Sequence, residues 1–178
     1  MKTLVWDTET TGLLQPSIVP LEKQPNIISL YGSMIDDEGN VLESIDLNFN
    51  PGFPVEPIIT KITGLTNEFL ADKPKFSEHE EQIRNFVMSA DVTIAHNAKF
   101  DCGMLNNELK RCGTFELMVW PRILCTVEST MSIRGHRLNL TALHTHLFGK
   151  AFDSAHSAGG DVAALTACVI ELRRLGYL

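Results

Sequence analysis

The chain has 178 residues, a length that fits one domain with a sizeable buried core. Hydrophobic residues make up 44% and charged residues 21%, as in an ordinary water-soluble protein, and no apolar run approaches the roughly 20 residues that span a bilayer. The net charge of −7 argues against binding of nucleic acid through a broad basic surface. Because the N-terminus reads as a strand and not as a signal peptide, we expect one cytoplasmic domain over residues 1–178, without membrane contact.

Three strands are predicted in the first part of the chain. Residues Thr3–Trp6 are apolar or β-favouring and indicate a buried strand. A loop with several prolines follows over 14–25. Two further strands are predicted over Ile27–Ile35 and Val41–Phe49, and the intervening residues 36–40, DDEGN, are typical of the turn in a hairpin.

The rest of the chain alternates between helical and strand patterns. Apolar spacing predicts a helix over Ser77–Ser89, opened by a capping box of Ser77 and Glu80. Short strands are expected over 92–95 and 122–126, the second followed by a helix. The other expected helices cover 58–63, 100–111, 138–147 and 161–175. This order of elements indicates an α/β domain with a mixed sheet.

Two carboxylates stand close together at the end of the first predicted strand. Because side chains alternate along a strand, Asp7 and Glu9 point to the same side. Two carboxylates so placed repel each other unless a cation lies between them, although a solvated strand end would also explain the pair. The segment that follows, TTGL over residues 10–13, is small and rich in hydroxyls, so a ligand can approach its backbone closely.

A third acid follows the strand over 92–95. That strand runs into the polar turn His96-Asn97, and Asp101 stands in the first turn of the next helix. Its structural explanation is a negative charge that complements the helix dipole. Its functional explanation is a metal ligand at the same sheet edge as the first two acids.

The last segment joins His156 to Asp161. A regular helix turns by about 100° per residue, so five residues separate the two side chains by about 140° on one straight helix. The intervening Gly159-Gly160 pair suggests a hinge: Asp161 would begin the helix, and His156 would lie on a mobile loop before it. A histidine beside a metal held by carboxylates suits a general base, whereas a surface loop histidine is the structural alternative.

Taken in order, these segments resemble the DEDDh 3′–5′ exonucleases, a family with the ribonuclease H-like fold. The motifs are DTETTGL over 7–13, HNAKFD over 96–101, and His156 with Asp161 five residues later. The segments ITGLT over 62–66 and LNLTAL over 138–143 also resemble the family, so the resemblance covers essentially the whole chain. It implies a mixed five-stranded sheet flanked by helices, with three antiparallel N-terminal strands and then parallel strands.

The resemblance implies a role for each matching residue. Two divalent ions, Mg²⁺ or Mn²⁺, would be held by Asp7, Glu9, Asp101 and Asp161, and His156 would be the general base. The residues expected to contact the substrate are Thr8, Thr10, Leu13, Ile62, Thr63 and Asn97. Asn97 has an Asx-type cap of the turn as its alternative role. Relatives often carry histidine at the position of Thr63. Thr63 therefore departs from the family pattern, and this departure concerns the contacts to the sugar or base of the substrate.

The implied reaction is hydrolysis of the last phosphodiester at a 3′ end, releasing nucleoside 5′-monophosphates. Residues 69–76, FLADKPKF, are especially similar to the epsilon proofreading subunit of bacterial replicative DNA polymerase, which favours single-stranded DNA as substrate and a DNA polymerase as partner, in replication or repair. Because the chain ends soon after the last expected helix, a stand-alone exonuclease is also open. Two alternatives remain: an exoribonuclease like oligoribonuclease or ribonuclease T, and an inactive module that binds nucleic acid or a polymerase.

Overall fold

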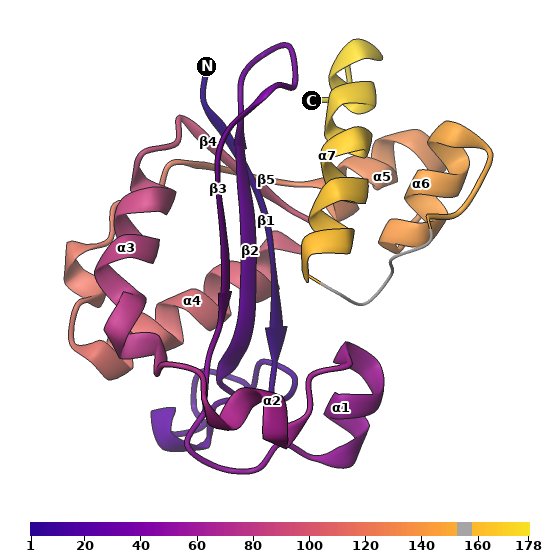
Figure 1. The fold of residues 1–178 in the computed structure, drawn as a ribbon. Helices are drawn as coiled ribbons and strands as arrows, with labels where there is room; N and C mark the ends of the chain where they lie inside the picture. The colour runs from indigo at the N-terminus through magenta and orange to yellow at the C-terminus, as the bar shows by residue number, and fades with distance from the viewer. Residues whose placement is uncertain (153–157) are drawn as a thin grey trace.

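Five strands form one mixed sheet in the computed structural model, which describes residues 1–152 and 158–178 (Figure 1). The strands are β1 (Thr3–Thr10), β2 (Ile27–Ile35), β3 (Val41–Asn48), β4 (Val92–Ala95) and β5 (Arg122–Cys125). Their order across the sheet is β3-β2-β1-β4-β5. β1, β2 and β3 are antiparallel neighbours, and β4 and β5 run parallel to β1. The predicted sheet is therefore confirmed.

Helices cover both faces of this sheet and one of its ends. They are α1 (Pro57–Thr63), α2 (Asn67–Ala71), α3 (Phe76–Met88), α4 (Ala98–Cys112), α5 (Thr126–Arg134), α6 (Leu140–Phe148) and α7 (Ala158–Arg174). α3 and α4 cover one face, α7 lies on the other, and α1 and α2 lie beyond the end of β1 (Figure 1). Among the described residues, no helix is long and apolar enough to cross a membrane.

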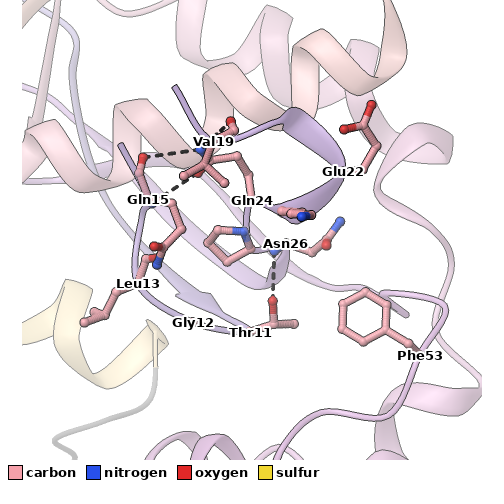
Figure 2. A pocket seen from close by; sticks show the side chains of 11 residues that line it. Thr11, Gly12, Leu13, Gln15, Val19, Glu22, Gln24, Asn26 and Phe53 are labelled. Carbon is pink, nitrogen blue, oxygen red and sulfur yellow. Dashed lines mark hydrogen bonds between the residues drawn. The ribbon is translucent and has the colours of Figure 1, made fainter. Parts of the chain in front are cut away.

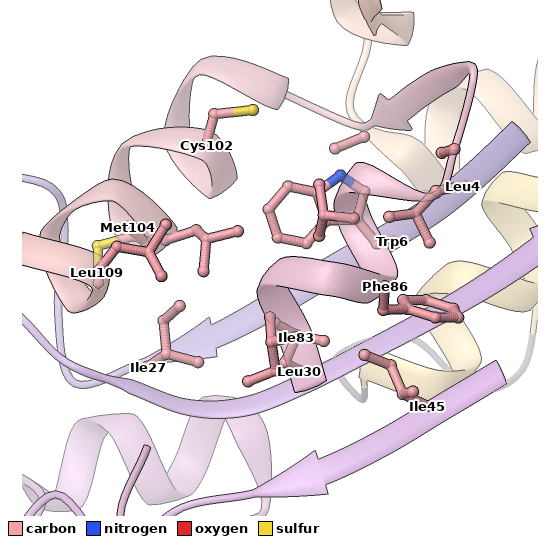
Figure 3. Close-up of a cluster of buried hydrophobic side chains, with 14 of the residues drawn as sticks. Leu4, Trp6, Ile27, Leu30, Ile45, Ile83, Phe86, Cys102, Met104 and Leu109 are labelled. Carbon is pink, nitrogen blue, oxygen red and sulfur yellow. The ribbon is translucent and has the colours of Figure 1, made fainter. Parts of the chain in front are cut away.

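The alternation of side chains along β1 divides the core into two layers. Leu4 and Trp6 pack among side chains of α3 and α4, including Phe86 and Met104 (Figure 3). Val5, between them in sequence, faces the opposite way and packs against α7. Each of these three β1 side chains is at most 1% exposed. The central strand is thus held on both faces, and the same alternation sets where the polar residues at its end must point.

Several predicted boundaries are wrong for identifiable reasons. β1 continues to Thr10, because residues up to Thr10 pair with β2. α3 begins at Phe76, where the Glu78 carboxylate accepts the Lys75 N–H at 2.7 Å. The predicted capping box is therefore wrong, since Glu80 is buried and instead accepts a hydrogen bond from Arg84 at 2.7 Å.

The glycine pair before Asp161 also differs from the prediction. α7 begins at Ala158, so Gly159 and Gly160 are helical and do not form a hinge. A Cβ at position 159 would lie 3.5 Å from Cδ2 of Tyr31, so the helix backbone at Gly159 lies close to a side chain of β2. The glycine therefore lies at a close approach between helix and sheet. The short helix α2 and the 3₁₀ turns over Leu21–Lys23 and Phe115–Leu117 were not predicted.

Gly32 in the middle of β2 provides a test of this packing. A Cβ there would lie 3.0 Å from Leu4 Cδ1 and 3.2 Å from Phe86 Cε1, with little room for either neighbour to move. We expect Gly32→Ala to lower the free energy of unfolding by about 1–3 kcal/mol through overpacking. Urea denaturation measures this, and Ser44→Ala on the exposed edge strand β3 is the control, with an expected change below about 0.5 kcal/mol. Equal stability of the Gly32→Ala variant and the wild type would contradict the described packing.

Candidate active site

Three carboxylates from two elements meet at the end of β1. Asp7 and Glu9 lie on the face of β1 that Val5 also occupies, which is the face covered by α7. Asp161 lies in the first turn of α7. One oxygen from each of these three carboxylates lies within 4.8 Å of the other two. The structure therefore brings together three of the four predicted metal ligands, all half-buried.

The fourth predicted ligand, Asp101, approaches from the opposite face of β1. It lies in the first turn of α4 and is 2% exposed. Its Oδ1 accepts hydrogen bonds from the backbone N–H of Thr8 at 3.1 Å and from the Thr8 hydroxyl at 2.7 Å. Thr8, predicted to line a nucleotide pocket, thus orients Asp101. The intervening residue of the Asp-Thr-Glu motif ties α4 to the same strand that carries the other acids.

Burial and neighbouring acids destabilise the ionised forms of Asp7 and Glu9. Burial raises the pKa of Asp7 well above its usual value, and the negative charges of Asp101, Glu9 and Asp161 raise it further. Burial and the charges of Asp161 and Asp101 raise the pKa of Glu9 to about 7. Burial also raises the pKa of Asp101, against the lowering effect of the Thr8 hydrogen bonds. Such repulsion is relieved by a cation, and an all-oxygen donor set suits a hard cation such as Mg²⁺ or Mn²⁺.

Hydrogen bonds of His96 hold the turn between β4 and α4 in place. His96 accepts or donates at both ring nitrogens: Nδ1 lies 2.9 Å from the Thr126 hydroxyl and Nε2 lies 3.1 Å from the Leu138 carbonyl. Because a carbonyl only accepts, Nε2 carries the proton. Burial lowers the pKa of His96 to about 4, so the ring is neutral at pH 7. His96 therefore connects the end of β4 to α5 and to the segment before α6, a role that the sequence analysis missed.

Asn97 follows with an unusual backbone. Its φ of 82° and ψ of 47° are left-handed, and among the described residues it is the one non-glycine with positive φ. It stands at the N-cap of α4 without a side-chain cap hydrogen bond, so the cap alternative for Asn97 is wrong. Its side chain is exposed. Asparagine tolerates this conformation better than most residues, which explains its presence at the turn.

The residues expected around a terminal nucleotide are spread over the loop after β1 and over α1. Leu13 is 77% exposed and projects from its loop (Figure 2), and Ile62 is 49% exposed. The hydroxyls of Thr10 and Thr63 donate to the carbonyls of Gly12 at 2.7 Å and Ile59 at 3.0 Å. Their side chains therefore stabilise local backbone.

Leu13 also borders a cavity of about 490 Å³ between its loop and Phe53 (Figure 2). Phe53 is 50% exposed, and the sequence analysis did not single it out. Its exposed aromatic ring beside the cavity marks Phe53 in the structure. A single sequence does not show which aromatic side chains are exposed, so the sequence could not identify this residue. The predicted general base, His156, lies outside the described residues, so its position relative to the acids stays a prediction.

The comparison with known proteins agrees with this geometry. Residues 4–169 match the model of the RNase T family, described as an exonuclease family. The chain belongs to this exonuclease family. It is 29% identical over 163 residues to DNA polymerase III subunit epsilon of Buchnera aphidicola, a match that covers 88% of this chain and 66% of that protein. The predicted resemblance to the DEDDh exonucleases is thereby confirmed.

Solved structures of other exonucleases share the fold at low identity. Exonuclease I superposes with a TM-score of 0.80 at 19% identity, covering 97% of this chain and 41% of that one. The nuclease domain of 3′hExo, a DEDDh family member bound to rAMP, superposes with a TM-score of 0.76 at 12% identity, covering 98% and 92%. The match thus covers 66% of the length of the Buchnera epsilon subunit, slightly less than two thirds, and 92% of the 3′hExo nuclease domain.

The acidic cluster should destabilise the cation-free protein. Because folding raises the pKa of Asp7, this carboxyl group destabilises the folded state as the pH rises above the ordinary pKa of an aspartate, and the full cost is reached above the folded pKa. At pH 8 in EDTA, we expect Asp7→Asn to raise the free energy of unfolding by about 1–2 kcal/mol, or the melting temperature by roughly 2–8 °C. Adding Mn²⁺ should stabilise the wild type and have a much smaller effect on the variant.

The matched control is Glu43→Gln, which removes one negative charge from the exposed edge strand β3. It should leave both the melting temperature in EDTA and the response to Mn²⁺ unchanged. An Asp7→Asn protein that is no more stable than the wild type in EDTA would count against mutual repulsion in the cluster.

Proposed function

We propose that this chain is a 3′–5′ exonuclease that removes nucleoside 5′-monophosphates from single-stranded DNA with the help of two divalent cations. The observation that carries the proposal is the meeting of Asp7, Glu9 and Asp161 within 4.8 Å. Family membership supports the reaction class, because the matching model covers most of the chain. The closeness of three half-buried carboxylates supports a cation, because like charges in a partly buried site destabilise one another.

Each acid then has a defined task. Asp7, Glu9 and Asp161 would hold the cations between β1 and α7, and Asp101, oriented by Thr8, would complete the set from α4. Bound Mg²⁺ or Mn²⁺ would supply positive charge next to the attacking and leaving oxygens of the phosphodiester. Leu13 and Ile62, both exposed and apolar, would contact the terminal base, and Asn97 would contact the backbone of the substrate.

The proton of the attacking water needs an acceptor. His96 is unsuited, because both of its ring nitrogens are engaged in hydrogen bonds within the protein. We therefore keep His156 as the proposed general base, on the strength of its place in the third motif. Histidine is the side chain that ordinarily gains and loses a proton near physiological pH, which suits this task.

The choice of DNA over RNA rests on the relatives. The Buchnera relative is a subunit of DNA polymerase III, which supports a DNA substrate, a polymerase partner and a place in cytoplasmic replication or proofreading. The structure of the 3′hExo nuclease domain with rAMP keeps an exoribonuclease as the second candidate. Matched 3′-labelled DNA and RNA oligonucleotides decide between them: we expect the kcat/KM for DNA to exceed that for RNA, and the reverse order would favour the second candidate.

Substitution of the acids tests the reaction itself. With Mg²⁺ and a 3′-labelled single-stranded oligonucleotide, we expect Asp7→Asn and Asp161→Asn to lower kcat by about a hundredfold or more, because each removes a cation ligand. EDTA should abolish wild-type activity, and Glu43→Gln should retain it. Nucleotide release at wild-type rates by either ligand variant would refute the proposed site, and complete lack of release by the wild type would favour an inactive binding module.

The role of His156 requires a separate measurement. We expect His156→Ala to lower kcat by about 10²–10⁴-fold, the usual contribution of general base catalysis. The midpoint of the Mn²⁺-dependent rise in melting temperature should stay the same, since a base is not a cation ligand. A changed Mn²⁺ midpoint with an unchanged kcat would assign His156 to cation binding.

A further inference from the structure

An open groove of about 640 Å³ runs between α4 and the loop of residues 14–21. We call it the α4 groove. The α4 side is formed by Lys99, Gly103, Asn106, Asn107 and Lys110. Apart from the adjacent Asn106 and Asn107, these positions are three or four residues apart and so share one face of the helix. The described residues that line the groove include two lysines and several amides but no Asp or Glu, in a chain of net charge −7.

The groove begins at the end of α4 that also carries Asp101. Lys99 lies in the same first turn of α4 as Asp101, whose side chain reaches Thr8 on β1. From there the groove follows the helix to Lys110. The eleven residue-to-residue steps from Lys99 to Lys110 correspond to about 16 Å of helix, the length of about five stacked nucleotides at roughly 3.4 Å each. A strand whose 3′ end occupies the acidic site has this path available for its upstream part.

The wall opposite α4 is held in place by part-buried hydrogen bonds. Gln24 is 6% exposed, and its Nε2 donates to the carbonyls of Gln15 and Val19, each at 3.3 Å (Figure 2), and to that of Pro16 at 3.1 Å. Arg111 donates from α4 to the Gln24 carbonyl at 2.7 Å and to that of Pro25 at 3.0 Å. The groove is thus formed before any ligand arrives, which lowers the entropy cost of binding.

The loop also rests directly on α4. A Cβ at Gly103 would lie 2.5 Å from Leu14 Cδ2, so the absence of a side chain at this position lets Leu14 reach the helix. Leu14 and Pro16 give this wall an apolar surface, while the α4 wall is polar. Asn106 accepts from Trp120 Nε1 at 3.1 Å through its carbonyl oxygen, so its NH₂ group can still donate.

We propose that the α4 groove binds the single strand on the 5′ side of the scissile phosphodiester. Lys99 and Lys110 contact its phosphates, the amides of α4 donate to phosphate or base oxygens, and the apolar loop wall contacts sugars and bases. This inference rests on the proposed exonuclease function. It also resolves how an acidic protein holds a polyanion: the contact is confined to one groove without acids, next to a site whose own acids are neutralised by cations.

The salt dependence of binding tests the groove without catalysis. Anisotropy of a 5′-labelled dT15 oligonucleotide is measured in EDTA between about 50 and 200 mM KCl. We expect Lys99→Ala/Lys110→Ala to weaken binding about tenfold and to reduce the slope of log affinity against log salt by about 1.4, because each phosphate contact to a single strand contributes about 0.7. The control Lys2→Ala/Lys75→Ala removes the same charge from exposed positions outside the groove and should keep the wild-type slope.

Kinetics separate the groove from the proposed reaction. With Mg²⁺, the groove variant should lower kcat/KM for dT15 through KM and leave the p-nitrophenyl ester of thymidine 5′-monophosphate unaffected, since p-nitrophenol there replaces the whole upstream strand. The proposed binding of the strand in the α4 groove would be overturned if the groove and control variants changed the slope of log affinity against log salt equally. It would also be overturned if the groove variant lost equal kcat/KM on both substrates. If the wild type cleaves neither substrate, the proposed function fails, and the anisotropy slopes still decide on the groove.

Discussion

The structure depends on one constraint, the two-sided burial of β1. Leu4 and Trp6 pack toward α3 and α4, and Val5 packs toward α7, each nearly inaccessible to water. A shift of one residue in the pairing register of β1 would expose these three side chains and would turn every later side chain of β1 to the opposite face of the sheet. The register of β1 therefore also fixes the direction of Asp7 and Glu9 toward α7 and of Thr8 toward α4. Core packing and site geometry are set by the same alternation.

This arrangement places destabilising charge on the most constrained strand. Burial and neighbouring acids raise the pKa values of Asp7 and Glu9, and burial raises that of Asp101 although the hydrogen bonds from Thr8 lower it. A strand held on both faces can bear such a cost, because it has no alternative packing through which to move the carboxylates apart. The raised pKa values thus agree with a site that is complete only when cations are bound.

Polar side chains fix the irregular segments that follow β1 and β4. Neutral His96 connects β4 to α5 and to the Leu138 carbonyl, while Gln24 and Arg111 fix the loop after β1 against α4. Each of these side chains donates hydrogen bonds to backbone carbonyl groups in irregular segments, where no strand or helix supplies a partner. Order in these loops therefore comes from a few long polar side chains, which also shape the surfaces next to the proposed site.

The sequence by itself determined the mixed sheet, the shared direction of Asp7 and Glu9, and the family, because periodicity and motif order are local properties of the chain. It did not decide the role of Gly159-Gly160, since a glycine pair fits both a hinge and a close helix contact; only the Tyr31 ring beside Gly159 identifies the second. Nor did it show that Thr8 holds Asp101, or that Lys99 and Lys110 border a groove with a loop some 80 residues earlier. These contacts join segments distant in sequence, and tertiary packing alone sets the distances between them.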